Sequence, residues 1–281
     1  MHGKVVVMTG GTSGIGEVAA ERLAGLGARL VLVARDRARG EATLARLRAQ
    51  GPGVGHVARY ADLSLIADTK RVAAQIAATE PRIDVLINNA GAMFGHRRVT
   101  ADGLELTFAT NHMSYFLLTH GLRERLLASA PARVVNTSSS AHRRADVDFD
   151  DLQSARGYRG FMAYSRSKLC NILYTRELAR RSAGTGVTAN CLHPGFVATR
   201  FGDASGGFFS YVVRASKQVF AISSEKGAET LVYLASSPEV ATISGGYFYQ
   251  CQLTTPTRAA QDDAAARRLW AETARLAGLS G

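Results

Sequence analysis

The sequence predicts an α/β fold in which a doubly wound parallel sheet of about seven strands is flanked by helices. Apolar runs of strand length alternate with segments of helical period, which is the pattern of repeated βα units. The 281 residues, of which 46% are hydrophobic, suffice for the core of one large domain. No repeat, low-complexity tract or linker divides the chain, so we expect a single domain over residues 1–281.

The first βα unit has the clearest pattern. Residues 5–8 (VVVM) form an apolar run that is typical of a strand buried on both faces. A glycine-rich turn follows it. Val18, Ala19, Leu23 and Leu26 then recur at helical spacing, and Gly27 predicts the end of this helix.

The later elements continue the same alternation. Further strands are expected at residues 29–34, 54–60, 83–87, 133–137, 187–192 and 246–250. Helices are expected at residues 36–50, 64–79, 104–127, 161–181, 224–235 and 263–276. In the helix at 64–79, for example, Ile66, Thr69, Val72, Ala73 and Ile76 mark one inner face.

Polar and turn-forming residues follow the ends of successive strands. Asp62 follows the third strand, and Asn111 lies among apolar neighbours inside a helix, where a polar residue needs an explanation. The others are Asn88, Asn89, Ala90, Gly91, Ser138, Ser139, Ser140, His193, Pro194 and Gly195. Because ligands of such sheets bind beyond the carboxyl ends of the strands, these residues together indicate one site.

Tyr164 and Lys168 stand four residues apart in FMAYSRSKLCNIL, so they share one face of a helix. A nearby ammonium favours the phenolate, and we therefore expect Lys168 to lower the pKa of Tyr164. A tyrosine of this kind can exchange a proton with a substrate oxygen near neutral pH. The alternative interpretation of the spacing alone is a solvated pair.

The glycine turn at residues 9–16 (TGGTSGIG) predicts a nucleotide site. Its spacing is Gly-x-x-x-Gly-x-Gly and not G-x-G-x-x-G. A bare structural turn is the alternative interpretation. The strand before the turn and the helix after it favour a pyrophosphate held by backbone N–H groups at the helix N-terminus.

The chain resembles the short-chain dehydrogenase/reductase family from residue 4 to about residue 250. The motifs that carry the resemblance are TGGTSGIG at 9–16, ADL at 61–63, NNAG at 88–91, Asn111, NTSS at 136–139, YSRSK at 164–168 and PGFVAT at 194–199. Stretches such as NILYTRELARR and GVTANCLHPG look like the retinol dehydrogenase branch. The resemblance implies a Rossmann-like fold. Membrane-bound members of that branch carry an N-terminal anchor, which this sequence lacks, so we expect a soluble, cytoplasmic enzyme.

The resemblance also implies roles for individual residues. Tyr164 is expected to be the general acid/base, Lys168 to hold the nicotinamide ribose, and Asn111 to hold a water in a proton relay. Ser139 is expected to hydrogen-bond the substrate oxygen, with Ser138 as the alternative. The expected cofactor-binding residues are Thr9, Gly10, Thr12, Ser13, Gly14, Ile15, Gly16, Arg35, Asp62, Leu63, Asn89, Ala90, Gly91, Tyr164, Lys168, Pro194, Gly195, Val197 and Thr199.

The end of the second strand predicts the cofactor. An NAD enzyme carries an acidic residue there, whereas this chain has Ala34 followed by Arg35, with Arg37 and Arg39 close by. A guanidinium pairs with a 2′-phosphate, which a carboxylate would repel. We therefore expect NADP(H) to be preferred over NAD(H); the alternative interpretation of Arg35 is a solvated first-turn helix residue.

The substrate is predicted less sharply than the reaction. Five aromatic residues lie between 201 and 220, and we expect residues 200–223 to form a lid over a lipophilic substrate, or else a helix at an oligomer interface. A helical extension is expected at about 259–277. The helices at 104–127 and 161–181 are surfaces on which relatives dimerise, so a homodimer or homotetramer is possible.

The leading prediction is an NADPH-dependent reductase that converts a lipophilic aldehyde or ketone to its alcohol. An NAD(P)⁺-dependent secondary alcohol dehydrogenase in catabolism is the first alternative, because it would use every one of the same site residues. A non-catalytic member of the fold that senses a nucleotide is the second alternative. The intact set of Asn111, Ser139, Tyr164 and Lys168 argues against it.

Composition argues against other classes. The formal charge of +11 comes from short basic clusters without interleaved aromatics, so we expect no nucleic-acid partner. Apolar runs are only of strand length, which predicts no membrane span. The three cysteines are scattered and suit a reducing compartment. We expect no metal site, because the spacing of His112, His142 and His193 suits packing or hydrogen bonding and not a ligand set.

Overall fold

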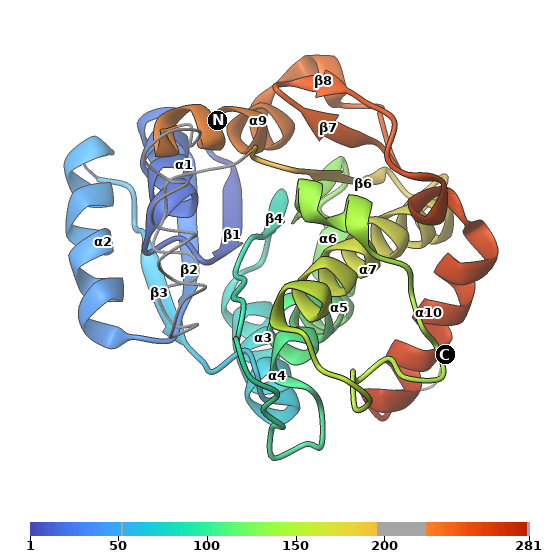
Figure 1. Ribbon diagram of the computed structural model, residues 1–281. Helices are drawn as coiled ribbons and strands as arrows, with labels where there is room; N and C mark the ends of the chain where they lie inside the picture. Colours follow the sequence, from blue (N-terminus) through green and yellow to red (C-terminus); the bar gives the residue numbers. More distant parts are fainter. Residues whose placement is uncertain (52, 196–222, 280–281) are drawn as a thin grey trace.

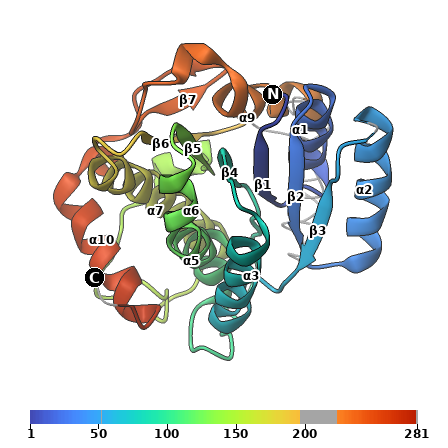
Figure 2. The same cartoon turned by 180° about the vertical axis from the view of Figure 1, so that it is seen from behind.

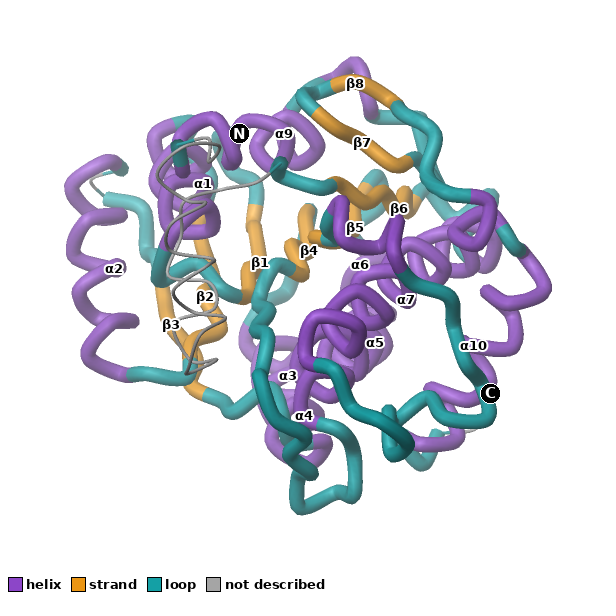
Figure 3. Tube along the Cα trace, viewed as in Figure 1, coloured by secondary structure: helices purple, strands orange, loops and turns teal. Residues whose placement is uncertain are grey.

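The computed structural model describes residues 1–51, 53–195 and 223–279. Its centre is one sheet with the strand order β3-β2-β1-β4-β5-β6-β7-β8 (Figures 1 and 3). All neighbouring strands are parallel except β7 and β8, which are antiparallel. The strands are β1 (Val5–Thr9), β2 (Arg29–Ala34), β3 (Val57–Tyr60), β4 (Val85–Asn88), β5 (Ala132–Thr137), β6 (Val187–Leu192), β7 (Tyr247–Tyr249) and β8 (Gln252–Leu253).

The predicted α/β class and its mostly parallel, doubly wound sheet are confirmed. The strand order reverses between β1 and β4, which is the switch point of such a sheet. The described part of the chain adds one strand to the seven expected. This strand, β8, is two residues long and returns from β7 through Gln250 and Cys251, both of which have positive φ. The predicted third strand begins later than expected, at Val57.

Helices cover both faces of the sheet (Figures 1 and 2). One layer contains α1 (Gly14–Gly25), α2 (Arg37–Gln50) and α9 (Ser224–Ser236). The other contains α3 (Ile66–Thr79), α5 (Ser114–Gly121) and α7 (Gly160–Arg181), and α10 (Asp263–Leu276) lies alongside α7. Short helical turns are η2 (Ser140–Arg144), η4 (Pro238–Val240) and η5 (Arg258–Gln261). No helix in the described ranges combines the length and the apolar character that crossing a bilayer requires.

Two hydrophobic cores lie on the two faces of the sheet because strand side chains alternate in direction. In β1, Val7 belongs to the core beneath α3, α5 and α7, whereas Val6 and Met8 belong to the core beneath α1, α2 and α9. All three side chains are fully buried. The continuous apolar run of β1 thus follows from its burial on both faces.

The helix expected at residues 104–127 is divided into four parts. They are α4 (Leu106–Phe108), the π-helical turn η1 (Ala109–Met113), α5 and α6 (Arg123–Ala128). The helix starts later than expected because the Glu105 carboxylate caps the backbone N–H groups of Thr107 and Phe108, at 2.8 Å each. At its other end Gly121 packs against α3, where a Cβ would lie only 2.7 Å from the Ala73 Cβ.

Asp84 ties the start of β4 to the start of β1. Its buried carboxylate accepts hydrogen bonds from the Lys4 ammonium and the Val5 backbone N–H, both at 2.9 Å, and from Arg82 at 2.8 Å. Burial alone would raise the pKa of Asp84, but these donors and the positive charges outweigh it, so the pKa lies below its usual value. The ionised carboxylate therefore stabilises the folded state.

We expect Asp84→Asn to lower the free energy of unfolding at pH 7 by about 1–2 kcal/mol, since Lys4 and Arg82 remain partly exposed. Because the folded-state pKa is depressed, the contribution is present above about pH 4 and is lost as the pH falls through the folded-state pKa. Urea unfolding at pH 7, 5 and 3 measures it. An equal difference at all three pH values, or an equal loss in the exposed control Asp150→Asn, would contradict this account.

Candidate active site

Tyr164 and Lys168 lie on the face of α7 that is turned toward the ends of β4 and β5. Tyr164 is 9% exposed and Lys168 is 2% exposed, so the solvated-pair interpretation is wrong. The Lys168 ammonium donates a hydrogen bond of 3.0 Å to the backbone carbonyl of Thr137, the last residue of β5. Its Nζ is 5.7 Å from the centre of the Tyr164 ring. The helical spacing read from the sequence thus places both groups inside the protein.

The shift of the Tyr164 pKa is opposite to the one expected from the sequence. Burial raises the pKa of Tyr164 to about 12, and a hydrogen bond with Ser139 acts in the other direction. Burial also lowers the pKa of Lys168 to about 7, so the lysine is only partly charged near neutral pH. Both shifts have the same main physical cause, which is the loss of solvent around the two buried groups. Tyr164 accordingly keeps its proton at neutral pH.

The two candidate serines have different partners. The Ser138 hydroxyl is buried and donates a hydrogen bond of 2.7 Å to the backbone carbonyl of Lys168. Ser139 is half-buried, and its hydroxyl accepts a hydrogen bond from the Ala141 N–H at 3.2 Å while also interacting with Tyr164. Of the two hydroxyls, the one of Ser139 therefore faces the Tyr164 phenol.

Asn111 lies in the π-helical turn η1 and is fully buried. Its side chain binds both backbone groups of Ala92, accepting from the N–H at 2.8 Å and donating to the carbonyl at 2.9 Å. It also donates to the Ser167 hydroxyl on α7 at 2.9 Å. A Cβ built on Gly91 would lie 3.2 Å from the Lys168 Nζ and 3.3 Å from the Asn111 Oδ1. Asn111 thus joins the loop after β4 to the helix that carries Lys168, and its expected water relay stays a prediction.

The glycine turn forms an open helix N-terminus between β1 and α1. Gly10 and Gly14 have positive φ, and a Cβ on Gly16 would lie 2.1 Å from the Gly10 carbonyl oxygen, so only glycine fits there. Ser13 at the N-cap forms no side-chain cap, which leaves the first N–H groups of α1 for a ligand. Thr12 and Ile15 are half-buried beside it.

The ends of β1 and β4 are locked together beside this turn. The buried Thr9 hydroxyl accepts hydrogen bonds from the N–H groups of Asn89 at 2.9 Å and Ala90 at 3.0 Å. The Asn89 amide donates to the Gly10 carbonyl at 3.2 Å. The polar residues after β1 and β4 therefore converge at the switch point, and the cradle of small residues fits the pyrophosphate of a dinucleotide.

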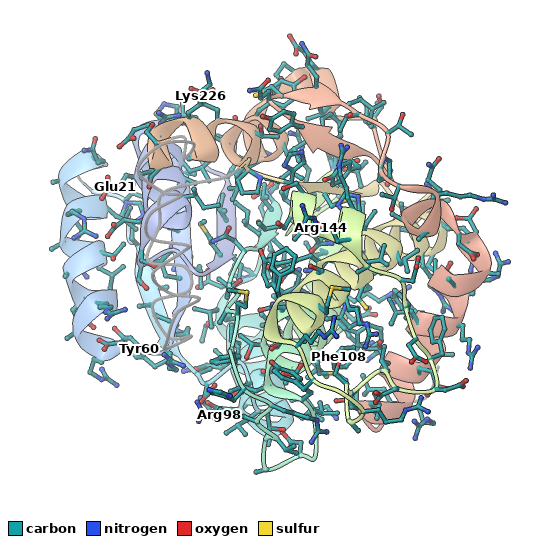
Figure 4. All side chains as sticks on the ribbon, in the orientation of Figure 1. Glu21, Tyr60, Arg98, Phe108, Arg144 and Lys226 are labelled. Atoms are coloured by element: carbon teal, nitrogen blue, oxygen red, sulfur yellow. The ribbon has the colours of Figure 1, made fainter. Side chains whose placement is uncertain are left out.

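The ends of β2 and β3 form the outer part of the same edge. Arg35 is exposed, and Asp36 caps α2 by accepting from the Arg39 N–H at 2.9 Å. The Arg37 guanidinium lies 4.4 Å from the ring centre of Tyr60, which Figure 4 labels. Asp62 accepts hydrogen bonds from the N–H and hydroxyl of Ser64, and Leu63 packs on the core.

The end of β6 leads to the last group of predicted residues. Gly195 has a φ of 85° after Pro194, and its N–H donates to His193 Nδ1 at 3.3 Å. Val197, Thr199 and residues 200–222 of the predicted lid at 200–223 lie outside the described residues. His193 stacks on Tyr249 at 4.2 Å, and His142 contacts the Ser139 carbonyl at 2.7 Å through Nδ1, so both act as the packing and hydrogen-bonding residues expected.

Sequence reasoning missed Asn171 and the Thr137 carbonyl. The Asn171 amide donates hydrogen bonds to the backbone carbonyls of Asn111 at 2.9 Å and Thr137 at 3.2 Å. Asn171 carries the same signal as Asn111, because it is a polar residue within an apolar helical stretch (KLCNIL). A backbone carbonyl has no such signal in the sequence.

The family model of short chain dehydrogenases matches residues 4–206, which include the glycine turn, Asn111, Ser139, Tyr164 and Lys168. The chain belongs to the short-chain dehydrogenase/reductase family. Enzymes of this fold bind a nicotinamide dinucleotide, and the cradle between β1 and β4 fits one.

Known proteins agree with this assignment. The chain is 42% identical to retinol dehydrogenase 14 of Homo sapiens, with 99% of this chain and 88% of the relative covered. It is also 42% identical to Homo sapiens retinol dehydrogenase 13, at 99% and 85% coverage. The expected retinol dehydrogenase-like branch is therefore confirmed.

Solved structures of the family share the fold. An uncharacterized protein from Mycobacterium paratuberculosis superposes with a TM-score of 0.79 and 31% identity, covering 99% of this chain and 95% of that one. The active-site complex of Pseudomonas aeruginosa RhlG with NADP has a TM-score of 0.70 and 28% identity, at 88% and 94% coverage.

Proposed function

We propose that this protein is an NADP(H)-dependent oxidoreductase that interconverts a lipophilic aldehyde or ketone and its alcohol, and that it works as a reductase. The observation that carries the proposal is the cluster of half-buried Ser139 with buried Tyr164 and Lys168 beside the glycine turn. A buried phenol that keeps its proton at neutral pH is suited to protonate a substrate oxygen. A cytoplasmic location is part of the same proposal.

In the proposed reduction, Tyr164 gives its phenolic proton to the substrate oxygen. The cofactor, when bound, supplies the hydride that the carbonyl carbon receives. The Ser139 hydroxyl, which interacts with the Tyr164 phenol, donates a hydrogen bond to the same oxygen and stabilises the negative charge that develops on it. Lys168 holds the ribose hydroxyls of the nicotinamide half.

The remaining contacts to the cofactor follow from the edge of the sheet. The N–H groups of α1 would hold the pyrophosphate, and Asp62 with Leu63 would contact the adenine half of the cofactor. The backbone of Pro194 and Gly195, with Val197 and Thr199, would hold the carboxamide. The residue types suit each of these contacts.

Arg35 supports the choice of NADP(H). Its exposed side chain follows the end of β2, where Ala34 replaces an acidic residue, and it forms no ion pair with the described residues. We expect Arg35→Asp to change the ratio of kcat/KM for NADPH over NADH by about 10²-fold in favour of NADH, because a carboxylate repels the 2′-phosphate and binds the 2′-hydroxyl. Arg48→Asp is the matched control, because the Arg48 side chain is also exposed but lies in the last turn of α2, away from the end of β2. Unchanged selectivity in Arg35→Asp would contradict the assignment.

The proposed activity is tested with a panel of lipophilic aldehydes and ketones and of the corresponding primary and secondary alcohols. The carbonyl compounds are assayed with NADPH and NADH, and the alcohols with NADP⁺ and NAD⁺, by the absorbance of the reduced cofactor. Faster reduction with NADPH supports the proposal. Faster oxidation with NAD⁺ or NADP⁺ would favour the alternative, a catabolic alcohol dehydrogenase with the same site residues. Absence of turnover with every pair would overturn both.

A further inference from the structure

The C-terminal helix α10 is linked to the candidate active site although it lies beyond the segment that the family model matches. Thr273 on α10 is fully buried. Its hydroxyl lies 3.0 Å from Nε2 of His112, and Nδ1 of the same ring lies 3.3 Å from the Asn171 side-chain oxygen. His112 follows Asn111 directly in η1, and Asn171 lies one turn after Lys168 on α7. Figure 1 shows α10 running alongside α7.

The partners of Thr273, His112 and Asn171 determine which atom donates and which accepts in each of their hydrogen bonds. The Asn171 amide nitrogen donates to two carbonyls, so its oxygen is the atom that faces His112. That oxygen can only accept, so His112 carries its hydrogen on Nδ1. Nε2 must then accept the hydrogen of the Thr273 hydroxyl. Complete burial lowers the pKa of His112 to about 4, so the ring stays neutral and the order is kept at physiological pH.

At the other end of this series of hydrogen bonds, Asn171 binds two backbone carbonyls of the active site. Asn171 donates to the Asn111 carbonyl at 2.9 Å and to the Thr137 carbonyl at 3.2 Å. The Thr137 carbonyl is also the acceptor of the Lys168 ammonium at 3.0 Å. Asn171 and Lys168 therefore share one acceptor, the Thr137 carbonyl at the end of β5. A displacement of Asn171 is thus expected to shift the carbonyl that holds the Lys168 side chain.

Aromatic side chains also connect α10 with η1 and α7. The His112 ring lies 5.1 Å from the Phe108 ring and 5.9 Å, edge-on, from Tyr174. Trp270, one turn before Thr273 on α10, stacks on the other side of this cluster at 5.7 Å from Tyr174. The helix thus contacts η1 and α7 by aromatic packing as well as by the hydrogen bond from Thr273.

We propose that Thr273, His112 and Asn171 are positioning residues through which α10 sets the geometry of Lys168 and Asn111. The inference rests on the proposed function for its catalytic consequence. It assigns a task to a segment outside the matched family pattern: α10 completes the support of the catalytic lysine. None of the three residues needs to touch substrate or cofactor.

The test uses the full-length protein with Thr273→Val, which keeps the shape and removes the hydrogen-bond donor. We expect kcat to fall about five- to tenfold with the KM for the carbonyl substrate changed less than twofold, since a small displacement of catalytic groups costs rate more than binding. Thr273→Ser should restore kcat. The matched control is Thr69→Val on α3, an equally buried helical threonine whose hydroxyl donates, among the described residues, only to the carbonyl of Leu65, the N-cap of the same helix. It should leave kcat unchanged.

A second variant keeps the inference falsifiable. His112→Phe preserves a ring between Phe108 and Tyr174 and removes both ring nitrogens. If Thr273 acts on the active site only through its hydrogen bond to His112, the double variant His112→Phe/Thr273→Val loses no more kcat than His112→Phe alone. Additive losses, a lack of rescue by Thr273→Ser, or an equal loss of kcat in Thr69→Val would each overturn the proposal.

Hydrogen exchange gives a readout that does not depend on turnover. In Thr273→Val, amide exchange should accelerate in the peptides that contain η1 and residues 164–175, and it should not do so in Thr69→Val. Faster exchange confined to α10 would overturn the coupling. Absence of any turnover in the wild-type protein would overturn the proposed function instead, while this exchange experiment still decides whether α10 is coupled to the site.

Discussion

Tyr164→Phe is expected to reduce kcat for carbonyl reduction by about 10³-fold while the dissociation constant of NADPH changes less than about threefold. The substitution removes one oxygen from a side chain that is already nine-tenths buried, so packing is retained. The lost oxygen carries the proton that the substrate oxygen must receive, and the neighbouring Ser139 hydroxyl is too weak an acid to replace it. Steady-state rates and calorimetric titration with NADPH measure the two quantities.

Tyr115→Phe is the matched control for this experiment. Tyr115 is fully buried, its ring lies 5.7 Å from the Lys168 Nζ, and its hydroxyl has no hydrogen-bond partner among the described residues. Removing that oxygen should therefore leave kcat within about twofold of the wild type. Turnover of Tyr164→Phe at the wild-type rate would refute the acid role, and an equal loss in both variants would assign the effect to packing.

Ser139→Ala is expected to lower kcat by about 10²-fold, because one hydrogen-bond donor to the developing oxyanion is lost. Ser138→Ala is the neighbouring comparison. It removes the bond of 2.7 Å to the Lys168 carbonyl, so it should lower the free energy of unfolding by about 1 kcal/mol and kcat by less than about fivefold.

Steady-state kinetics and urea unfolding of both serine variants separate the two roles. The expected pattern is a large rate loss with little loss of stability for Ser139→Ala, and the reverse for Ser138→Ala. If Ser138→Ala loses the larger share of kcat, the assignment of the two hydroxyls is wrong. Equal rate losses would mean that the loop after β5 acts only as a unit.

The order of strands and helices was predictable because each element carries its own hydrophobic pattern. The helix expected at 36–50 begins one residue later, at Arg37, with Asp36 as its cap. The prediction of one continuous helix at 104–127 was wrong, because contacts with residues distant in the sequence divide this segment. The close approach of Gly121 to Ala73 is one, and the hydrogen bonds of Asn111 to Ala92 are another. Such contacts leave no periodic trace in the local sequence.

The candidate site was predictable where chemistry resides in side chains at strand ends. The depth to which the site residues are buried could not be predicted from the sequence. For Tyr164, this burial reverses the expected shift of its pKa. The spacing of Tyr164 and Lys168 fixes their common face but not the loss of solvent around it. His112 could be read only as a packing or hydrogen-bonding residue, because its partner Thr273 is 161 residues away.

The seam between α7 and α10 also contains the single tryptophan of the chain, Trp270. Its indole lies 5.0 Å from Phe116, and the guanidinium carbon of Arg181 lies 4.4 Å from its ring centre. The tryptophan emission of the whole molecule therefore arises at one place, where a cation and two aromatic rings surround the fluorophore. The fluorescence of Trp270 therefore reports on the packing of α10 against α7. A shift of its emission maximum would show that α10 has moved away from α7.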